Sequence, residues 1–419
     1  MNIESKYREG ISQALLAIQS LEELADFLNS IQEIRKLGNP HYKFENKEVT
    51  VQHLRYVLYS KESKYHTFEI PKKSGGVRTI MSPNRMVKHM QTLLNLALQC
   101  FYTPYSAATG FVPGRSIVTN AKRHINKKYV YNIDLENFFP SIYFSRVKSV
   151  LSKVPFTVNK PGDLVHFGNV ERATTGTIHP QVAHYIANIC CHEGKLPQGA
   201  PTSPTLSNMM CKILDYRLYK FAEEHKMTFT RYADDITFSS DLPVFSAECR
   251  TAIADIIENQ GFNLNRAKER LQIYGKGVDG ELYRNRQEVT GVVVNKRTNV
   301  SKKYFRNLKA AIHNWEVKGY DKANELHETH YVNEKGFTRY NGNIPRMELV
   351  VGGKLEFLGM VRGKENTQYR LLKLRFDQLC KKQQVDVDYL KQILDLWEEK
   401  GLKKAMERYY NRQKNLVDG

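Results

Sequence analysis

The chain has 419 residues, of which 41% are hydrophobic, enough to bury the cores of two or three subdomains. Lys and Arg number 63 against 44 Asp and Glu, and the formal charge of +19 favours polyanionic partners, above all nucleic acid. The sequence has neither an apolar run near the roughly 18 residues of a spanning helix nor a secretory leader after Met1, so we expect a cytoplasmic protein without a membrane partner. The six cysteines form no C-x-x-C pair and are expected to be reduced thiols.

Helical and strand patterns alternate in the first third of the chain. Apolar residues three and four apart predict helical structure over residues 11–34, and residues 88–102 predict another helix. Between them, residues 65–83 predict a strand, a Gly-Gly turn and a second strand. A β-rich segment, Tyr129 to Ile133, then predicts a buried strand that ends at Asp134.

The middle of the chain continues the mixed pattern. Residues 157–181 are polar and predict an insertion, and residues 184–194 predict a helix that ends at Gly194. A Pro/Gly loop then leads into a long helix within residues 196–225. Residues 227–241 predict a strand, a tight turn and a strand, and residues 247–261 predict a helix.

The last part of the chain is basic and helical. After a short strand in residues 288–295, helices are predicted over residues 301–319, 374–384 and 389–413. The order of elements predicts an α+β catalytic core with an appended helical nucleic-acid clamp.

Two adjacent acids, Asp234 and Asp235, lie at the tip of the predicted hairpin in RYADDITFSS. Acids are common in turns, so the pair alone is weak evidence. Asp134 ends another predicted strand, and PQGAPTSP lies between the two sites. Phosphoryl transfer between nucleotides needs carboxylates that hold two Mg²⁺ ions roughly 3.5–4 Å apart, and substrate phosphates supply the remaining ligands. These acids therefore predict a site for two Mg²⁺ ions, with Mn²⁺ as the alternative.

Five segments resemble, in order, the motifs of reverse transcriptases over roughly residues 65–295. FEIPKKSGGVRTI resembles the fingers motif, YNIDLENFFPSI the first acidic motif, and LPQGAPTSPTLSN the template and nucleotide platform. RYADD resembles the Y-x-D-D box, and GFNLNRAKER the lysine motif that follows it. The resemblance implies a right-hand polymerase fold, with fingers, a palm of antiparallel sheet plus helices, and a helical thumb. It also implies RNA-directed DNA polymerase activity on deoxynucleoside triphosphates (dNTPs).

The same resemblance implies roles for the charged residues of these motifs. Asp134 and Asp234 resemble the two principal metal ligands, and Asp235 resembles the third acid. Lys268 resembles the lysine that protonates the pyrophosphate leaving group; a plain phosphate or surface contact is the alternative.

Four further residues resemble those that bind the incoming nucleotide. Arg78 and Lys72 resemble the cations that grip the triphosphate, although a solvated turn is the alternative for Lys72. Gln198 and Gly199 resemble the residues that contact the nucleotide and let the backbone approach it closely.

Sugar selection is implied for Phe139, which follows the first acidic motif. At this position an aromatic ring presses on the sugar 2′ position and admits deoxynucleotides. Core packing is the alternative, with Phe138 as the more typical core residue.

Two short stretches resemble the markers of bacterial retron reverse transcriptases. NAKRH matches N-A-x-x-H, and VTG matches the tripeptide before the thumb. Retron enzymes bind a cognate structured non-coding RNA and copy part of it into single-stranded DNA, giving a branched RNA–DNA molecule (msDNA). They act in anti-phage defence with a separate effector protein. The RNA-binding residues implied by these markers are Asn120, His124, Val289, Thr290 and Gly291.

Other features leave alternatives open. The insertion near residues 156–181 and the region after residue 340 are longer than in the compact pattern, and GFVPGRS is more similar to group II intron enzymes. The alternatives are another defence-associated or group II intron-like reverse transcriptase, and a non-catalytic RNA-binding scaffold.

The basic tail supplies a further predicted RNA-binding surface. Three- and four-residue spacing places four cations on one helix face: Lys302, Lys303, Arg306 and Lys309. Tyr304, Trp315 and Tyr369 either stack on RNA bases or pack the thumb core.

The motif order predicts four domains. These are an N-terminal helical extension, fingers, a palm with the insertion, and a thumb with its extension. Their predicted bounds are residues 1–60, 61–128, 129–298 and 299–419.

Overall fold

The computed structural model of the chain divides into two compact units, Met1–Thr290 and Gly291–Gly419. It describes residues 5–38, 48–60, 64–71, 76–153, 156–158, 174–277, 279–335, 344–382 and 387–417. The first unit combines helices with antiparallel strands, and the described part of the second is almost entirely helical. The predicted α+β class is therefore confirmed, while the finer division of the first unit into extension, fingers and palm stays a prediction.

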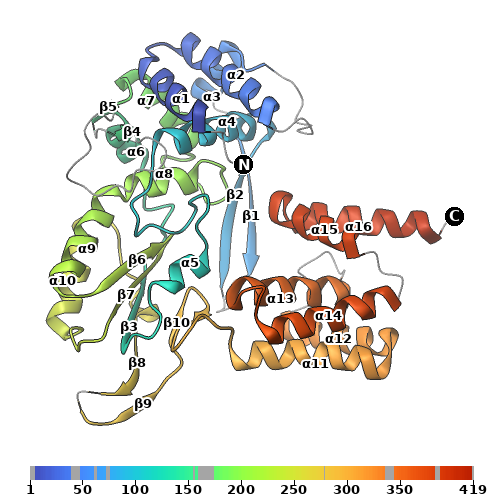
Figure 1. The fold of residues 1–419 in the computed structure, drawn as a ribbon. Helices are drawn as coiled ribbons and strands as arrows, with labels where there is room; N and C mark the ends of the chain where they lie inside the picture. Colours follow the sequence, from blue (N-terminus) through green and yellow to red (C-terminus); the bar gives the residue numbers. More distant parts are fainter. Residues whose placement is uncertain are drawn as a thin grey trace. The chain divides into compact units, whose positions relative to one another are not determined.

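Four helices gather at one end of the first unit (Figure 1). They are α1 (Ser5–Ala17), α2 (Leu21–Gly38), α3 (Val51–Tyr59) and α4 (Arg85–Phe101). α1 and α2 both pack on α4, and Leu15, Leu24 and Leu28 have no exposed surface. The helical pattern of residues 11–34 thus forms two helices. The Ser20 side chain accepts from Glu23 N and caps the start of α2, and the Glu23 side chain accepts from Gln19 N just before it.

A five-stranded antiparallel sheet forms the other part of this unit, in the order β6-β7-β3-β8-β9. The strands are β3 (Tyr129–Asp134), β6 (Thr228–Tyr232), β7 (Asp235–Ser240), β8 (Arg270–Lys276) and β9 (Leu282–Arg284). All of β3 is buried, and it lies inside the sheet with β7 on one edge and β8 on the other. Helices α9 (Lys212–Glu224) and α10 (Ala247–Glu258) lie beside β6 and β7 (Figure 1), and α9 contacts β6.

An exposed hairpin forms the predicted strand–turn–strand of the fingers motif. It pairs β1 (Tyr65–Pro71) with β2 (Val77–Pro83) in antiparallel register. Met81 N donates to Gln198 O at 2.8 Å, so the base of this hairpin is fixed to the LPQGAPTSP loop.

Shorter elements connect these parts. They are α5 (Ile117–Lys122), α6 (Phe144–Lys153), β4 (Phe156–Val158), β5 (Thr174–Gly176), α7 (Pro180–Cys190), α8 (Ser203–Met210), the 3₁₀ turn Arg266–Lys268 and β10 (Glu288–Val289). Within the predicted insertion, β4 pairs with β5, and residues 159–173 lie outside the described part. The helix expected to reach Gly194 ends at Cys190, and the long helix within residues 196–225 is divided at Cys211.

The second unit begins with β11 (Val292–Val293) and continues as helices packed on one another. They are α11 (Lys302–Lys318), α12 (Tyr320–Lys335), α13 (Met347–Arg362), α14 (Thr367–Lys382), α15 (Val387–Lys400) and α16 (Leu402–Val417). Leu308, Ile312 and Trp315 bury one face of α11. The helix predicted over residues 389–413 is divided at Gly401, whose φ of 82° suits glycine.

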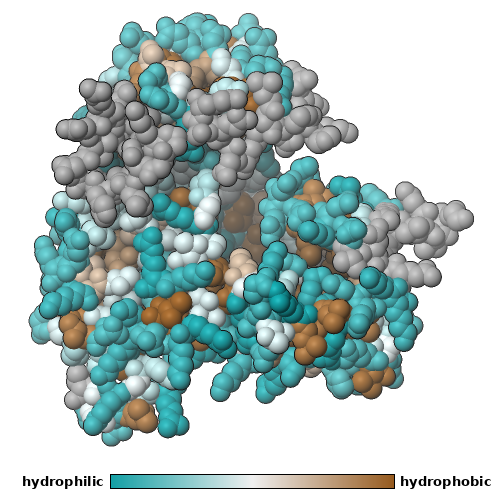
Figure 2. All heavy atoms as spheres, viewed as in Figure 1, coloured by the Kyte–Doolittle hydropathy of each residue, from teal (hydrophilic) through white to brown (hydrophobic). Residues whose placement is uncertain are grey.

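The surface is mainly polar. Figure 2 shows a mostly hydrophilic face with small separate hydrophobic patches. In the described ranges, none of the helices combines the length and apolar character needed to cross a bilayer. The cysteines are free thiols, as predicted, and five of the six are buried.

Candidate active site

The turn between β6 and β7 carries two of the predicted acids. Tyr232 pairs with Asp235, so Ala233 and Asp234 form a two-residue turn. Ala233 has a φ of 58°, in the left-handed region where side chains other than glycine are strained. This buried, strained residue projects Asp234 at the end of the hairpin.

The third acid reaches the turn through the sheet. Asp134 ends β3 and is the register partner of Asp235 on β7. Leu135 N also donates to Asp234 O at 3.0 Å, which ties the end of β3 to the turn. Strand pairing thus brings together the three acids that the sequence predicted as one site.

The three carboxylates repel one another. Desolvation by the surrounding protein raises the pKa of Asp235 to about 6 although the residue keeps exposed surface, with further increases from Asp234 and Asp134. Burial and then Asp134 also raise the pKa of Asp234. Because desolvation and mutual repulsion disfavour the charged carboxylates, a bound cation would stabilise the cluster.

Lys268 is the basic residue beside this cluster. Its Nζ lies 2.9 Å from Asp134 Oδ2, and its charge lowers the pKa of both Asp234 and Asp235. Asn265 N donates to Asp134 O at 2.8 Å, so the 3₁₀ turn that carries Lys268 is fixed to β3. The predicted lysine therefore lies beside the three carboxylates, while its role as a proton donor stays a prediction.

The donor set fits Mg²⁺ or Mn²⁺ shared with a substrate. Carboxylate oxygens are hard ligands, and Mg²⁺ uses only one or two of them together with water and phosphate oxygens. Within the described ranges, no group of three or more His, Cys, Asp or Glu side chains is placed so that it could hold a metal ion by itself. Asp134, Asp234 and Asp235 would therefore hold the ions only together with phosphate oxygens and water.

The predicted nucleotide-binding residues lie on two elements. Arg78 is exposed on β2, and its charge lowers the pKa of Asp234, so it acts on the same site. Gln198 is half-buried in the loop fixed to Met81. Lys72 lies outside the described residues.

Gly199 approaches protein backbone in this structure. Its φ is 129°, and an added Cβ would lie 2.8 Å from Met81 O. Packing against β2 thus requires glycine here, independently of the nucleotide contact that the sequence predicted.

Phe138 and Phe139 differ in burial, while the sugar-gate role of Phe139 stays a prediction. Phe138 is buried and packs on Phe262, with ring centroids 5.8 Å apart. Phe139 remains half-exposed, and its ring centroid lies 6.0 Å from that of Phe111, which itself lies 6.4 Å from that of Tyr232, next to the turn of Ala233 and Asp234 (the catalytic turn below). Phe139 therefore keeps the accessible surface that a sugar gate needs.

A buried network behind the turn was missed in the sequence. Arg231 forms a two-point ion pair with Asp215 and donates to Ala233 O at 3.0 Å and to Asn208 Oδ1 at 3.1 Å. The available signal was a charged residue on an apolar helix face, since Asp215 shares its face with Cys211 and Leu218.

Most of the residues singled out from NAKRH and VTG lie in the interior of the protein. Asn120 accepts from Thr109 Oγ1 at 2.7 Å, and His124 contacts Thr230 Oγ1 on β6 and Ser239 Oγ on β7, both at 2.7 Å. Val289 has no exposed surface either. The side chains of Asn120, His124 and Val289 are enclosed by the fold, which argues against direct side-chain contact with RNA; RNA binding through this region stays a prediction.

The remaining two marker residues are more accessible. Thr290 is half-buried and donates to Ile117 O at 3.4 Å, and Gly291 is exposed with a φ of 80°. RNA contact by these two stays a prediction.

The basic face of α11 is accessible. All four predicted cations are exposed, while the opposite face is buried: Lys302, Lys303, Arg306 and Lys309. Trp315 and Tyr369 are buried, and Tyr304 donates to Lys354 O at 2.8 Å. The core-packing alternative therefore holds for Trp315 and Tyr369.

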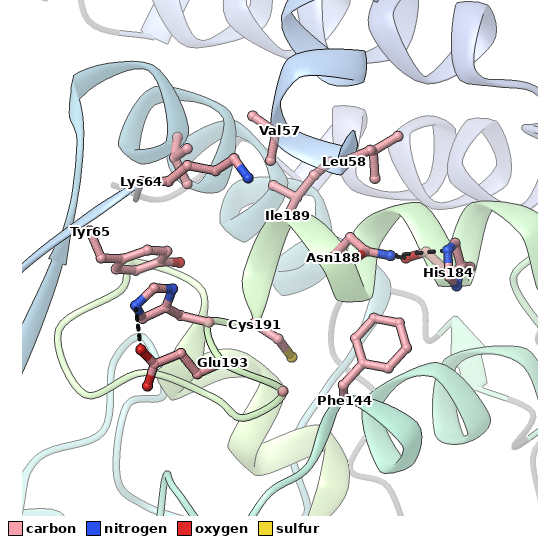
Figure 3. Close-up of a pocket in the computed structure, with 13 residues that line it drawn as sticks. Val57, Leu58, Lys64, Tyr65, Phe144, His184, Asn188, Ile189, Cys191 and Glu193 are labelled. Atoms are coloured by element: carbon pink, nitrogen blue, oxygen red, sulfur yellow. Dashed lines mark hydrogen bonds and ion pairs between the residues drawn. The ribbon is translucent and has the colours of Figure 1, made fainter. Parts of the chain in front are cut away.

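A cavity of about 440 Å³ lies apart from the acids. Figure 3 shows it among α3, the start of β1, α7 and the loop after α7. Tyr65 stacks on His192 with ring centroids 4.2 Å apart, and Asn188 donates to His184 O at 2.9 Å. None of the predicted site residues lines this cavity, so we place the chemistry at the catalytic turn.

Comparison with known families agrees with this geometry. The family described as "Reverse transcriptase (RNA-dependent DNA polymerase)" matches residues 70–294, which include all three acids and Lys268. The chain belongs to this reverse transcriptase family, and the predicted right-hand polymerase fold class is confirmed.

Individual relatives narrow the group. The chain is 36% identical to the retron Mx65 reverse transcriptase of Myxococcus xanthus over 59% of its own length and 55% of that protein. It is 30% identical to the retron Ec86 reverse transcriptase of Escherichia coli, over 69% of this chain and 83% of that protein. It is 34% identical to the retron Mx162 reverse transcriptase of M. xanthus, over 64% of this chain and 56% of that protein. Within the family the chain is therefore of the bacterial retron type, although it spans only just over half of two of these relatives.

Proposed function

We propose that this protein is an RNA-directed DNA polymerase that copies part of a cognate structured non-coding RNA into single-stranded DNA. The observation that carries the proposal is the convergence of Asp134, Asp234 and Asp235, with Lys268 2.9 Å from Asp134. The family match over residues 70–294 supports the same activity.

The chain's own residues divide the work of nucleotidyl transfer. Two divalent cations, when bound, stabilise the attacking 3′-hydroxyl oxygen and the leaving pyrophosphate. Asp134, Asp234 and Asp235 would hold them. Lys268 would donate a proton to the pyrophosphate, and Arg78 would bind the triphosphate with its planar fork. Phe139 would press on the sugar 2′ position and favour dNTPs.

The partner RNA is the second part of the proposal. The exposed cations of α11 present a surface suited to a phosphate backbone. Similarity to retron enzymes supports a branched RNA–DNA product and a role in anti-phage defence with a separate effector protein.

Co-purifying nucleic acid from cells that carry the native locus tests this function. Wild type would be compared with Asp234→Asn/Asp235→Asn and with Asp255→Asn, an exposed change on α10. Samples would be divided between ribonuclease and deoxyribonuclease treatment, and purified protein would be assayed for dNTP incorporation on an RNA template with a DNA primer.

We expect DNA joined to RNA through a 2′–5′ branch in wild type and Asp255→Asn, and none in the double variant. Bound RNA without DNA in all three, together with no incorporation on the supplied template, would instead indicate a scaffold. Unbranched DNA that is lost only in the double variant would retain the polymerase and reject the branched product.

A further inference from the structure

Phe111 forms an unusual corner beside the catalytic turn. Its φ is 59°, in the left-handed region that residues with a bulky side chain rarely adopt. Its ring is nevertheless 40% exposed, so core burial does not explain why the chain holds an aromatic residue here. Backbone strain that persists at an exposed aromatic residue calls for a functional explanation.

The corner is fixed to the turn from the side of Gly110. A Cβ added at Gly110 would lie 2.4 Å from Ala233 N, so the two backbones are in direct contact. Thr109 N donates to Arg231 O at 2.7 Å, and Asn208 Nδ2 donates to Gly110 O at 2.9 Å. These contacts give Phe111 a defined position relative to Asp234.

The ring of Phe111 closes a row of aromatic side chains. Its centroid lies 6.0 Å from that of Phe139 and 6.4 Å from that of Tyr232. Phe139 also contacts Phe138, with ring centroids 5.3 Å apart, and Phe138 is anchored in the core. The Phe139 ring thus contacts one buried ring and one partly exposed ring, that of Phe111.

We propose that Phe111 is a specificity-determining residue that supports the ring of Phe139 against the sugar of the incoming nucleotide. The inference rests on the proposed function of Phe139 as the sugar gate. A gate rejects a 2′-hydroxyl only if its ring cannot move aside, and Phe111 gives the Phe139 ring a contact beyond those of the core. Loss of Phe111 therefore weakens discrimination against ribonucleotides more than it weakens dNTP use.

The test measures kcat/KM for one dNTP and the matching ribonucleotide on the same primer and RNA template. The variants are Phe111→Asn, which tolerates a left-handed backbone but lacks the ring, Phe111→Tyr, which keeps the ring, Phe139→Ala and the double variant Phe111→Asn/Phe139→Ala. Tyr59→Asn, which removes a 71% exposed ring at the end of α3, is the matched control.

We expect Phe111→Asn to lower dNTP selectivity about 10-fold, mainly through faster ribonucleotide incorporation. Phe111→Tyr and Tyr59→Asn keep wild-type selectivity, and the double variant is no less selective than Phe139→Ala alone. Thermal midpoints should change little, because the Phe111 ring is largely outside the core.

The outcomes separate this inference from the function on which it rests. Relaxed selectivity in Phe139→Ala but not in Phe111→Asn overturns the role of Phe111 alone. Unchanged selectivity in Phe139→Ala overturns both the gate assignment and this inference. An equal loss of dNTP and ribonucleotide incorporation in Phe111→Asn also overturns it, because Phe111 would then serve nucleotide binding in general.

Discussion

Arg231 and Asp215 form an ion pair that has no exposed surface at all. Arg231 Nε lies 2.6 Å from Asp215 Oδ1, and Arg231 Nη2 lies 2.7 Å from Oδ2. Because the same guanidinium donates to Ala233 O, the pair links helix α9 to the catalytic turn. The position of Asp234 therefore depends on a charge pair on the opposite side of the hairpin.

Breaking this pair should cost both stability and activity. Asp215→Asn leaves a buried arginine without its counter-charge, and we expect a loss of about 3–5 kcal/mol in the free energy of unfolding. Arg231→Lys keeps the charge but cannot supply the planar fork, so dNTP incorporation should fall even at temperatures where the protein stays folded. Denaturant unfolding and incorporation assays would measure these effects. Arg217→Lys, exposed on α9, is the control, and equal losses in this control would contradict the argument.

The close approach of three carboxylates predicts that the free energy of unfolding rises when one of the three charges is removed. In metal-free protein, Asp235→Asn removes repulsion from Asp234 and Asp134, and we expect a gain of roughly 1 kcal/mol at neutral pH, reduced by the exposure of Asp235. Thermal midpoints measured with a chelator and then with Mg²⁺ would test this. Wild type should gain more from Mg²⁺ than Asp235→Asn does. If Asp235→Asn and the control Asp255→Asn change the thermal midpoint equally, repulsion among the three carboxylates does not lower stability.

The burial of His124 predicts a dependence of stability on pH. Burial, with smaller contributions from Arg123 and Lys127, lowers the pKa of His124 to about 3. An unfolded histidine titrates near 6.5, so the unfolded state binds more protons between these values. The stabilising effect is complete above about pH 6.5 and is lost as the pH falls toward 3.

Substitution of His124 isolates this effect. His124→Gln should flatten stability between pH 4 and 6.5, as measured by urea unfolding, while RNA affinity at pH 7.5 stays unchanged because the side chain is enclosed. His225→Gln, at an exposed histidine, should keep the wild-type pH profile. If the folded His124→Gln variant binds RNA more weakly, His124 contacts RNA directly, contrary to the burial seen in the structure.

The basic face of α11 predicts a change in the salt dependence of RNA binding. Replacing Lys302, Lys303, Arg306 and Lys309 with glutamine should weaken binding to all RNA sequences. It should also reduce the slope of log affinity against log salt concentration by about 0.7 for each lost phosphate contact to single-stranded RNA. Titrations at several salt concentrations would measure this slope. Lys381→Gln/Lys382→Gln, at exposed lysines of α14, is the control. An unchanged slope in the α11 variant would place the RNA elsewhere.

Local sequence was sufficient for the elements whose causes are local. A β-rich segment predicted β3, a strand–turn–strand pattern predicted the β6–β7 hairpin, and the spacing of cations predicted the exposed face of α11. The motif order predicted the family and the convergence of Asp134 with Asp234 and Asp235. Helix ends were less certain, since Cys211 and Gly401 divide helices that periodicity alone would continue.

The tertiary structure decided which polar residues face a ligand and which face the protein. An asparagine and a histidine occur both in binding sites and in protein cores. Only the tertiary contacts of Asn120 with Thr109, and of His124 with Thr230 and Ser239, show that these two are internal. Gly199 and Gly110 are required by backbones that lie far away in the sequence. The Arg231–Asp215 pair and the Phe111–Phe139 contact were hidden for the same reason. Such contacts depend on chain segments that only folding brings together, so no local pattern of residues encodes them.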